Sequence, residues 1–297
     1  MPELPDVVVY LEALSRFIVG KRLERLKLLS PFVLRSVDPS IDSINQQIVR
    51  GLRRIGKRIV LEFDRDLFLV IHLMIAGRLR WREPGKKPGM GPKQILAAFE
   101  FGDGTLFFTE ASSKKRASIQ LVKGEESLKA LDPGGLEPLE ATLDQFREAL
   151  RRESHTVKRS LTDPHILSGI GNAYSDEILH TAKLSPLKLT RSLNDDEIVR
   201  LYDAMRATLR VWIDQLRNDV RDGFPEKVTA FHNAMAVHGR YKQPCPVCGS
   251  PVQRIAYADN ECNYCARCQT GGKLLADRSL SRLLKGDWPK SIDELNQ

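Results

Sequence analysis

All five cysteines of this chain lie in one 24-residue window near its C-terminal end, and the first 244 residues contain none. They are Cys245, Cys248, Cys262, Cys265 and Cys268. A disulfide framework would spread its cysteines along the chain and use an even number, so the pattern argues against one. The outer four form two Cys-x2-Cys pairs with sixteen residues between them, which is the spacing of a four-thiolate zinc site.

We therefore predict one structural Zn²⁺ held by Cys245, Cys248, Cys265 and Cys268. Each Cys-x2-Cys knuckle offers two thiolates to one side of a tetrahedral ion, and four thiolates leave no open position for catalysis. Pairing Cys262 with Cys265 is an alternative register, but the outer pair gives a symmetric site with two knuckles. Unliganded thiols are the competing interpretation. Reduced thiols indicate a cytoplasmic protein, associated with the nucleoid if the source is bacterial.

Hydropathy patterning predicts an α+β protein whose first part is mainly β. Residues 5–19 carry apolar side chains at helical spacing, with a proline suited to the first turn and Gly20 suited to the end. From about residue 23 to 125 the pattern changes to short β-rich runs divided by turn signals, which is typical of an antiparallel sandwich or barrel. The clearest runs are 23–29, 58–63, 67–73, 95–101 and 105–110.

A proline- and glycine-rich linker at 132–139 separates this part from a helical one. Amphipathic patterns predict helices over 143–152, 170–184 and 194–219, followed by the cysteine hairpin. A short helix is predicted around 277–284. The expected domains are a helix-and-sandwich domain at 1–131, a helical domain at 140–240, a zinc finger at 241–271 and a tail at 272–297.

Lysine and arginine exceed aspartate and glutamate by 46 to 38, a formal net charge of +8. A basic surplus favours a polyanionic partner such as nucleic acid. The positive charge is concentrated in two clusters. One has five cations within residues 50–58, among them Arg54 and Lys57, and the other is a loop with Lys115 and Arg116. Either cluster alone is equally well explained as a solvated face. Because no apolar run approaches the roughly 20 residues that span a bilayer, and no secretory leader is expected, we predict no membrane partner.

The first residues of the chain suggest a nucleophile. An initiator Met1 before Pro2 is normally removed, which would leave Pro2 as a free secondary amine. With a pKa of about 7.7–8.0, a terminal amine is partly neutral near pH 7 and can attack a sugar C1′ or an aldehyde to form an iminium. Glu3 lies next to it and is a candidate for moving protons. Taken alone, such a chain start is far more common without catalysis.

Five motifs in one order strengthen this hypothesis. They are MPELPD at the start, Gly56-Lys57-Arg58, His72-Leu73, GIGNAYSDEIL and a four-cysteine finger ending YCARCQ. Together they resemble the formamidopyrimidine-DNA glycosylase and endonuclease VIII family of base-excision repair enzymes over nearly the whole chain. The resemblance implies an N-terminal helix with a β-sandwich, a helical domain with a helix–two-turn–helix, and a zinc finger, with DNA between two lobes.

The resemblance also assigns roles to residues. It makes Pro2 the nucleophile and Glu3 the proton donor and acceptor, and it implies that Lys57 contacts DNA and assists elimination. Asn172 and the preceding Gly171 are expected to bind a phosphate, because backbone amides at a glycine turn entering a helix form an anion site. The other predicted DNA contacts are Arg54, His72, Lys115, Arg116 and Lys158. A packing corner at Gly171 and a core histidine at position 72 are the alternatives.

Two positions depart from the family pattern. The family's finger hairpin carries an arginine that reaches a phosphate at the lesion, and here that place holds Asn260, which we keep among the predicted DNA contacts. An uncharged, short amide cannot replace a bidentate guanidinium. In the purine-lesion branch a methionine fills the hole left by the extruded base, and here Ile75 follows Met74 at that place. The resemblance therefore leaves open whether δ-elimination occurs and whether oxidised purines are the preferred lesion.

The resulting prediction is a bifunctional DNA glycosylase and abasic-site lyase that acts as a monomer on damaged duplex or abasic-site DNA. It would extrude an abasic site or a damaged base, which we expect to be oxidised, attack C1′ with Pro2 and cleave the strand by β-elimination. One alternative is a DNA-damage-binding module of the same fold without base removal, which Asn260 favours and the intact Pro2-Glu3 pair opposes. Another is a zinc-ribbon protein that binds RNA or protein.

Overall fold

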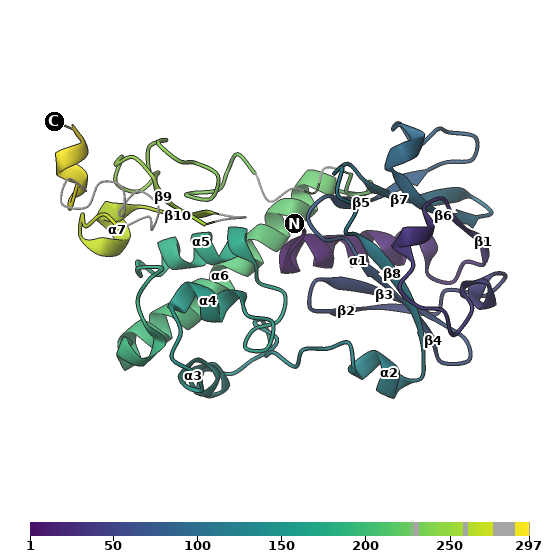
Figure 1. Ribbon diagram of the computed structural model, residues 1–297, viewed down its shortest axis with the longest axis horizontal. Coiled ribbons are helices and arrows are strands. Elements are labelled where there is room, and N and C mark those ends of the chain that lie inside the picture. The colour runs from purple at the N-terminus through teal and green to yellow at the C-terminus, as the bar shows by residue number, and fades with distance from the viewer. Residues whose placement is uncertain (227, 229–231, 258–260, 276–288, 297) are drawn as a thin grey trace. The chain divides into compact units, whose positions relative to one another are not determined.

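The computed structural model describes residues 1–226, 228, 232–257, 261–275 and 289–296 (Figure 1). These residues group into two compact units. The first comprises Met1–Pro133 and Trp212–Ala230, and the second comprises Gly134–Val211 and Phe231–Gln297. The predicted α+β class is confirmed, because a helix and a β-sandwich form the first unit and helices with a four-cysteine hairpin form the second.

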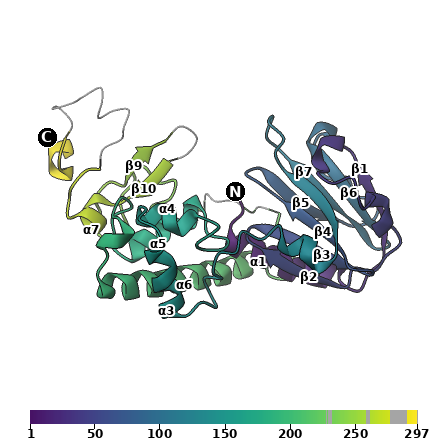
Figure 2. The ribbon, with the colours of Figure 1, turned by 60° about the horizontal axis from the view of Figure 1, so that its bottom comes forward.

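The first unit is built on two four-stranded antiparallel sheets, which Figure 2 shows as two layers. In spatial order, one sheet contains β1 (Leu23–Leu28), β6 (Ile95–Phe101), β7 (Gly104–Glu110) and β5 (Gly77–Arg82). The other contains β2 (Gly51–Ile55), β3 (Arg58–Phe63), β4 (Leu67–His72) and β8 (Ser118–Lys123). The observed sheets decide between the two predicted architectures in favour of the sandwich.

Apolar side chains from both sheets and from α1 (Leu4–Ile18) share one core. Along β5 they alternate with arginines, so that Leu79 and Trp81 are buried. Tyr10 and Leu14 of α1 are fully buried in the same cluster. Each such side chain stabilises the fold by roughly 1.5–3 kcal/mol. The core therefore fixes α1, and with it the start of the chain.

The end of the long helix α6 (Asp195–Val220) and the residues after it belong to the first unit, although the sequence placed 140–240 in one helical domain. Phe224 packs edge-on against Phe17 of α1, with ring centroids 5.5 Å apart. Arg217 forms a bidentate ion pair with Glu12 of the same helix α1. Aromatic packing and this ion pair explain why residues 212–230 group with the sandwich.

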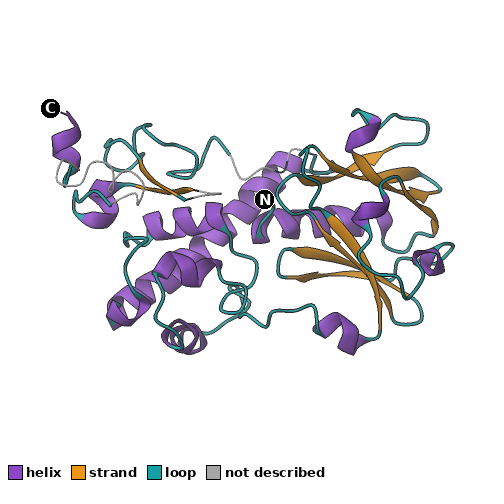
Figure 3. Cartoon of the chain, in the orientation of Figure 1, coloured by secondary structure: helices purple, strands orange, loops and turns teal. Residues whose placement is uncertain are grey.

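The second unit consists mainly of helices and a small hairpin (Figure 3). Its elements are α3 (Leu143–Arg151), α4 (Val157–Thr162), α5 (Asn172–Thr181), residues 195–211 of α6, β9 (Gln253–Ala256), β10 (Glu261–Tyr264) and α7 (Ala266–Thr270). Strands β9 and β10 pair in antiparallel register. Shorter elements of the two units are α2 (Glu125–Lys129) and the 3-10 turns Pro31–Val33, Ile41–Ile44, Pro92–Gln94, Thr190–Ser192 and Ile292–Asn296.

The five predicted strand runs and the three predicted helices of the second half are present. Strands β2, β5 and β8 and helices α2 and α4 were not predicted, because each is short or carries charged residues among its apolar ones. The predicted tail helix around 277–284 lies outside the described residues. Among the described residues, no helix is both long and apolar enough to cross a bilayer.

Candidate functional site

The first predicted functional residues lie at the N-terminus of α1, and the fold buries them. Pro2 is buried, and Glu3, which precedes the helix as its N-cap, is 2% exposed. The backbone N–H of Glu3 donates to Asp6 Oδ2 over 2.7 Å. A carboxylate at the third helical position that accepts from the N-cap N–H fixes the entry of the chain into the helix. Pro2 and Glu3 are therefore held in place by α1 itself.

Charged groups gather around this end of α1. Burial lowers the pKa of the terminal amine, which in this structure belongs to Met1, and the positive charges of Arg78 and Lys57 lower it further. The negative charge of Glu3 raises the pKa of this amine. Burial also lowers the pKa of Lys57, partly offset by the charges of Glu3 and Asp6. A buried, cation-flanked amine keeps more of its neutral, nucleophilic form near neutral pH.

Lys57 sits in the two-residue turn between β2 and β3. Gly56 precedes it with φ +58°, a left-handed conformation that favours glycine. The Arg54 guanidinium donates to the Gly56 carbonyl oxygen over 2.6 Å. The predicted DNA contact Arg54 therefore braces the turn that carries Lys57.

His72 ends β4 and lies opposite Arg58 of β3 and Ser118 of β8. Burial, with the nearby charges of Arg58 and Lys57, lowers the pKa of His72 to about 4. Its imidazole is therefore neutral near pH 7 and can offer hydrogen bonds but not a positive charge.

The loop between β7 and β8 carries the predicted contacts Lys115 and Arg116. The Glu110 carboxylate accepts the backbone N–H groups of Arg116 at 3.0 and 3.1 Å and of Ala117 at 3.2 Å. Lys115 Nζ donates to the Glu110 carbonyl oxygen, whereas Arg116 is exposed. Glu110 thus shapes this loop, and sequence reasoning did not single it out.

Most of the basic run 50–58 is engaged within the first unit. Arg50 pairs with Asp64, Arg53 pairs with Glu62 and Glu125, and Arg58 donates to the Leu131 carbonyl oxygen. Exposed pairs of this kind contribute little to stability, with a median of about 0–1 kcal/mol. Their carboxylates nevertheless reduce the charge that the run presents to a polyanion.

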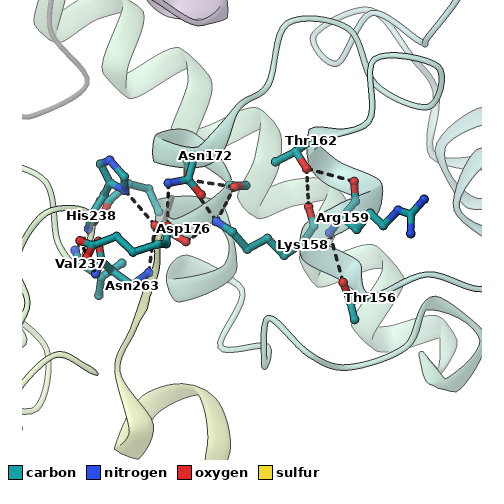
Figure 4. Close-up of polar contacts among 12 residues, drawn as sticks. Thr156, Lys158, Arg159, Thr162, Asn172, Asp176, Val237, His238 and Asn263 are labelled. Atoms are coloured by element: carbon teal, nitrogen blue, oxygen red, sulfur yellow. Dashed lines mark hydrogen bonds and ion pairs between the residues drawn. The ribbon is translucent and has the colours of Figure 1, made fainter. Parts of the chain in front are cut away.

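The predicted phosphate site lies in the second unit at the start of α5. Gly171 is the N-cap and Asn172 the first helical residue, so the positive end of the helix dipole lies there. Asn172 Nδ2 donates to the Glu261 carbonyl oxygen of β10 over 2.7 Å. Lys158 of α4 is also in contact with this turn, and its side chain is 13% exposed (Figure 4). Asn260 lies outside the described residues.

The four predicted zinc ligands come together in the second unit. Their sulfur atoms all lie within 4.8 Å of one another, with Cys248 and Cys265 Sγ 3.4 Å apart and Cys245 and Cys268 Sγ 3.9 Å apart. Sulfur atoms at about 2.3 Å from a tetrahedral zinc lie about 3.8 Å apart, so the cluster fits such an ion. Cys262 lies outside the cluster and is fully buried, and burial strongly raises the pKa of its thiol.

Two further carboxylates of α5 were missed by sequence reasoning. Asp176 is 1% exposed and Glu177 is 5% exposed. The Glu177 carboxylate accepts three successive backbone N–H groups, those of Ala236, Val237 and His238, at 2.7–2.9 Å. The signal available was their place within the GIGNAYSDEIL motif, where apolar neighbours on both sides indicate a buried helix.

Comparisons with known proteins match most of the chain to one family. Residues 1–114 match the family model described as the formamidopyrimidine-DNA glycosylase N-terminal domain, and residues 135–221 match the formamidopyrimidine-DNA glycosylase H2TH domain. A formamidopyrimidine-DNA glycosylase of Heliobacterium modesticaldum is 33% identical over 279 residues, 91% of this chain and 100% of that protein. An uncharacterized formamidopyrimidine-DNA glycosylase-like protein of Mycobacterium tuberculosis is 40% identical over 151 residues, 51% of this chain and 94% of that protein.

Solved structures resemble the chain over a similar extent. The Lactococcus lactis Fpg in complex with DNA containing an abasic site superposes with a TM-score of 0.79 at 25% identity, covering 90% of this chain and 99% of that one. MutM in complex with DNA containing carbocyclic 8-oxo-G gives a TM-score of 0.79 at 26% identity, covering 91% of this chain and 100% of that one.

Proposed function

The chain belongs to the formamidopyrimidine-DNA glycosylase family, and from that premise we propose that it is a base-excision repair glycosylase with abasic-site lyase activity. Its partner would be DNA that contains a damaged base or an abasic site, as in the complexes of its structural neighbours. The observation that carries the proposal is the placement of Pro2 and Glu3, which are both buried at the start of α1 beside Lys57.

In the proposed reaction the damaged nucleotide leaves the base stack, because its C1′ is not accessible within a duplex. After removal of Met1, the neutral Pro2 nitrogen attacks C1′, the bond to the base breaks, and Glu3 exchanges protons with the sugar as its ring opens. The resulting iminium acidifies the C2′ hydrogens. Loss of one C2′ proton then expels the 3′ phosphate by β-elimination.

The surroundings of the amine support this role. A nucleophilic amine must be neutral to attack. Burial, Arg78 and Lys57 lower the pKa of the Met1 amine, and we propose that the same surroundings act on the Pro2 amine once Met1 is removed. The same cations are suited to stabilising negative charge on a departing phosphate. The four-cysteine cluster would hold one Zn²⁺, whose four thiolates leave no open position, so the ion is proposed to stabilise the finger only.

Borohydride trapping on abasic-site DNA tests the proposal directly. The wild-type protein should form a covalent adduct, because borohydride reduces the iminium to a stable amine. Pro2→Gly should lose most of the adduct, and Glu3→Gln should lower its rate of formation. Arg217→Gln, which removes a surface ion pair with Glu12, is the matched control and should trap normally. Absence of any adduct with the wild-type protein would refute the lyase proposal.

The same variants separate the enzyme from a damage-binding module. A module without chemistry would bind abasic-site DNA and release it unchanged. Incubation with duplexes that contain an oxidised purine, an oxidised pyrimidine or an abasic site would identify the substrate. Gel analysis of the 3′ end would show whether elimination stops after the β step. We expect it to stop there, because Asn260 replaces the family arginine.

A further inference from the structure

One face of α5 is attached to the cysteine finger and to the chain that leads into it. Asn172, Asp176 and His180 recur at intervals of four residues, so they lie on one side of the helix. Asn172 donates to the Glu261 carbonyl oxygen, Asp176 Oδ2 accepts the Asn263 N–H at 3.1 Å, and His180 Nε2 lies 3.3 Å from Cys245 Sγ. The helix that begins at the proposed phosphate site is thus anchored along its length to the finger.

Asp176 is the centre of these contacts (Figure 4). Its carboxylate has no exposed side-chain surface. Oδ2 also lies 2.8 Å from His238 Nδ1, and Oδ1 pairs with the ammonium of Lys158. One carboxylate therefore joins α4, the segment before the finger, and strand β10. Buried carboxylates require such partners, because an uncompensated buried charge is strongly destabilising.

Lys158 has no donor to spare in this arrangement. Its ammonium group carries three N–H donors. Three acceptors lie within hydrogen-bond distance of Nζ: Asp176 Oδ1, Ser175 Oγ at 3.0 Å and the Asn172 carbonyl oxygen at 3.2 Å. All three belong to the first turns of α5. A lysine held in this way supports the start of the helix, whereas binding a phosphate would require it to leave acceptors inside the protein.

We propose that Lys158 and Asp176 are a positioning pair, which sets the start of α5 and the finger strand so that Gly171 and Asn172 can bind a DNA phosphate. Lys158 acts through Asn172 and does not itself neutralise a phosphate. This inference rests on the proposed function, because it presumes that the start of α5 binds DNA. It differs from the sequence-based assignment, in which Lys158 is a direct DNA contact.

The two roles predict different responses to salt. A cation that neutralises one phosphate contributes about 0.9 to the slope of log affinity against log salt concentration. The double variant Lys158→Met with Asp176→Asn removes one positive and one negative charge, so the net charge of the protein is unchanged. The single variants Lys158→Met and Asp176→Asn complete the double-mutant cycle. Lys188→Met removes a lysine that pairs with Glu197 in the same unit and is the control for a lost charge.

Binding is measured by fluorescence anisotropy with a duplex that carries a tetrahydrofuran abasic analogue, at several salt concentrations. We expect each single variant to bind about tenfold more weakly, or about 1.4 kcal/mol, because it leaves a buried charge without its partner beside the turn that binds phosphate. The double variant should bind more tightly than either single variant, because it leaves no unpaired buried charge, but more weakly than wild type, because the pair that sets the start of α5 is lost. Its salt slope should equal that of wild type.

A double variant with a slope shallower by about 0.9 would show that Lys158 neutralises a phosphate, and would overturn the inference. Single variants that bind as tightly as Lys188→Met would overturn it too. If the single variants fail to fold, the slope of the double variant alone decides. Since the analogue undergoes no elimination, this measurement stands apart from borohydride trapping. Wild-type protein that binds the analogue but forms no adduct would refute the lyase proposal and leave the positioning pair testable.

Discussion

Asp6 should make the first unit less stable as the pH rises, and replacing it should remove that contribution to the pH dependence. Its side chain is fully buried, Oδ2 accepts the Glu3 N–H, and Oδ1 has no hydrogen-bond partner among the described residues. Burial is the largest cause that raises its pKa, from 3.8 to about 7. Below pH 3.8 the carboxyl is protonated in both the folded and the unfolded state, and no penalty arises.

Between pH 4 and pH 7 the unfolded state releases this proton and the folded state retains it. A difference of about 3 pKa units at 1.36 kcal/mol each corresponds to about 4 kcal/mol of stability lost across that window. Asp6→Asn still accepts the Glu3 N–H but has no charge to bury. Its new buried N–H₂ donor would cost about 1–3 kcal/mol at every pH. The variant should therefore be less stable than wild type at pH 4 and more stable at pH 8.

Urea unfolding at a series of pH values measures this difference. The free energy of unfolding of Asp6→Asn relative to wild type should rise by about 4 kcal/mol from pH 4 to pH 8. Asp222→Asn removes an exposed aspartate from the same unit and should show no comparable trend. A difference between Asp6→Asn and wild type that stays constant with pH would refute the claim that a buried carboxyl titrates there.

Three further predictions concern other parts of the chain. The imidazole of His72, with a pKa lowered to about 4, should cost about 3 kcal/mol of stability as the pH falls from 6.5 to 4, and an NMR titration should find its midpoint near 4. Cys265→Ser should lower the zinc content measured by atomic absorption, whereas Cys262→Ser should leave it unchanged. Gly104→Ala should destabilise the sandwich by about 1–3 kcal/mol in thermal unfolding, because its Cβ would lie 2.3 Å from a buried indole. Gly91→Ala, with no atom within 4 Å, should be nearly neutral.

The sequence was most informative where neighbouring residues alone determine the structure, as in a single strand or a pair of closely spaced cysteines. Strand β3 has an unbroken apolar run, Ile59, Val60 and Leu61, which is buried as such a run indicates, and its predicted and observed bounds coincide at Arg58–Phe63. The four clustered cysteines could be selected because two Cys-x2-Cys pairs sixteen residues apart are typical of a metal site, and the structure decides against the alternative register with Cys262. Strand β2 could not be recognised, since Arg53 and Arg54 make it look like a charged loop.

What the sequence did not reveal depends on residues that are distant along the chain. Asp176 lies in a motif whose apolar neighbours indicate a buried helix, but its partners His238 and Asn263, 62 and 87 residues away, could not be identified from the sequence. The sequence likewise shows Lys158 only as a cation, and its three acceptors on α5 are known only from the structure. Charge and residue type can nominate a binding residue, but the use of its hydrogen-bonding capacity is decided by tertiary contacts.

The Glu177 carboxylate has a consequence for what this protein can bind. Successive backbone N–H groups that converge on one point form a concave receptor for anions. In the segment Ala236–His238 that receptor is already filled by the Glu177 side chain of helix α5. Burial raises the pKa of Glu177, and the three N–H groups oppose that rise. Glu177 thus acts as an intramolecular ligand, and a dissolved phosphate would have to compete with its high effective concentration. Removing it would leave an empty anion receptor beside the finger, where sulfate or phosphate from the buffer could bind.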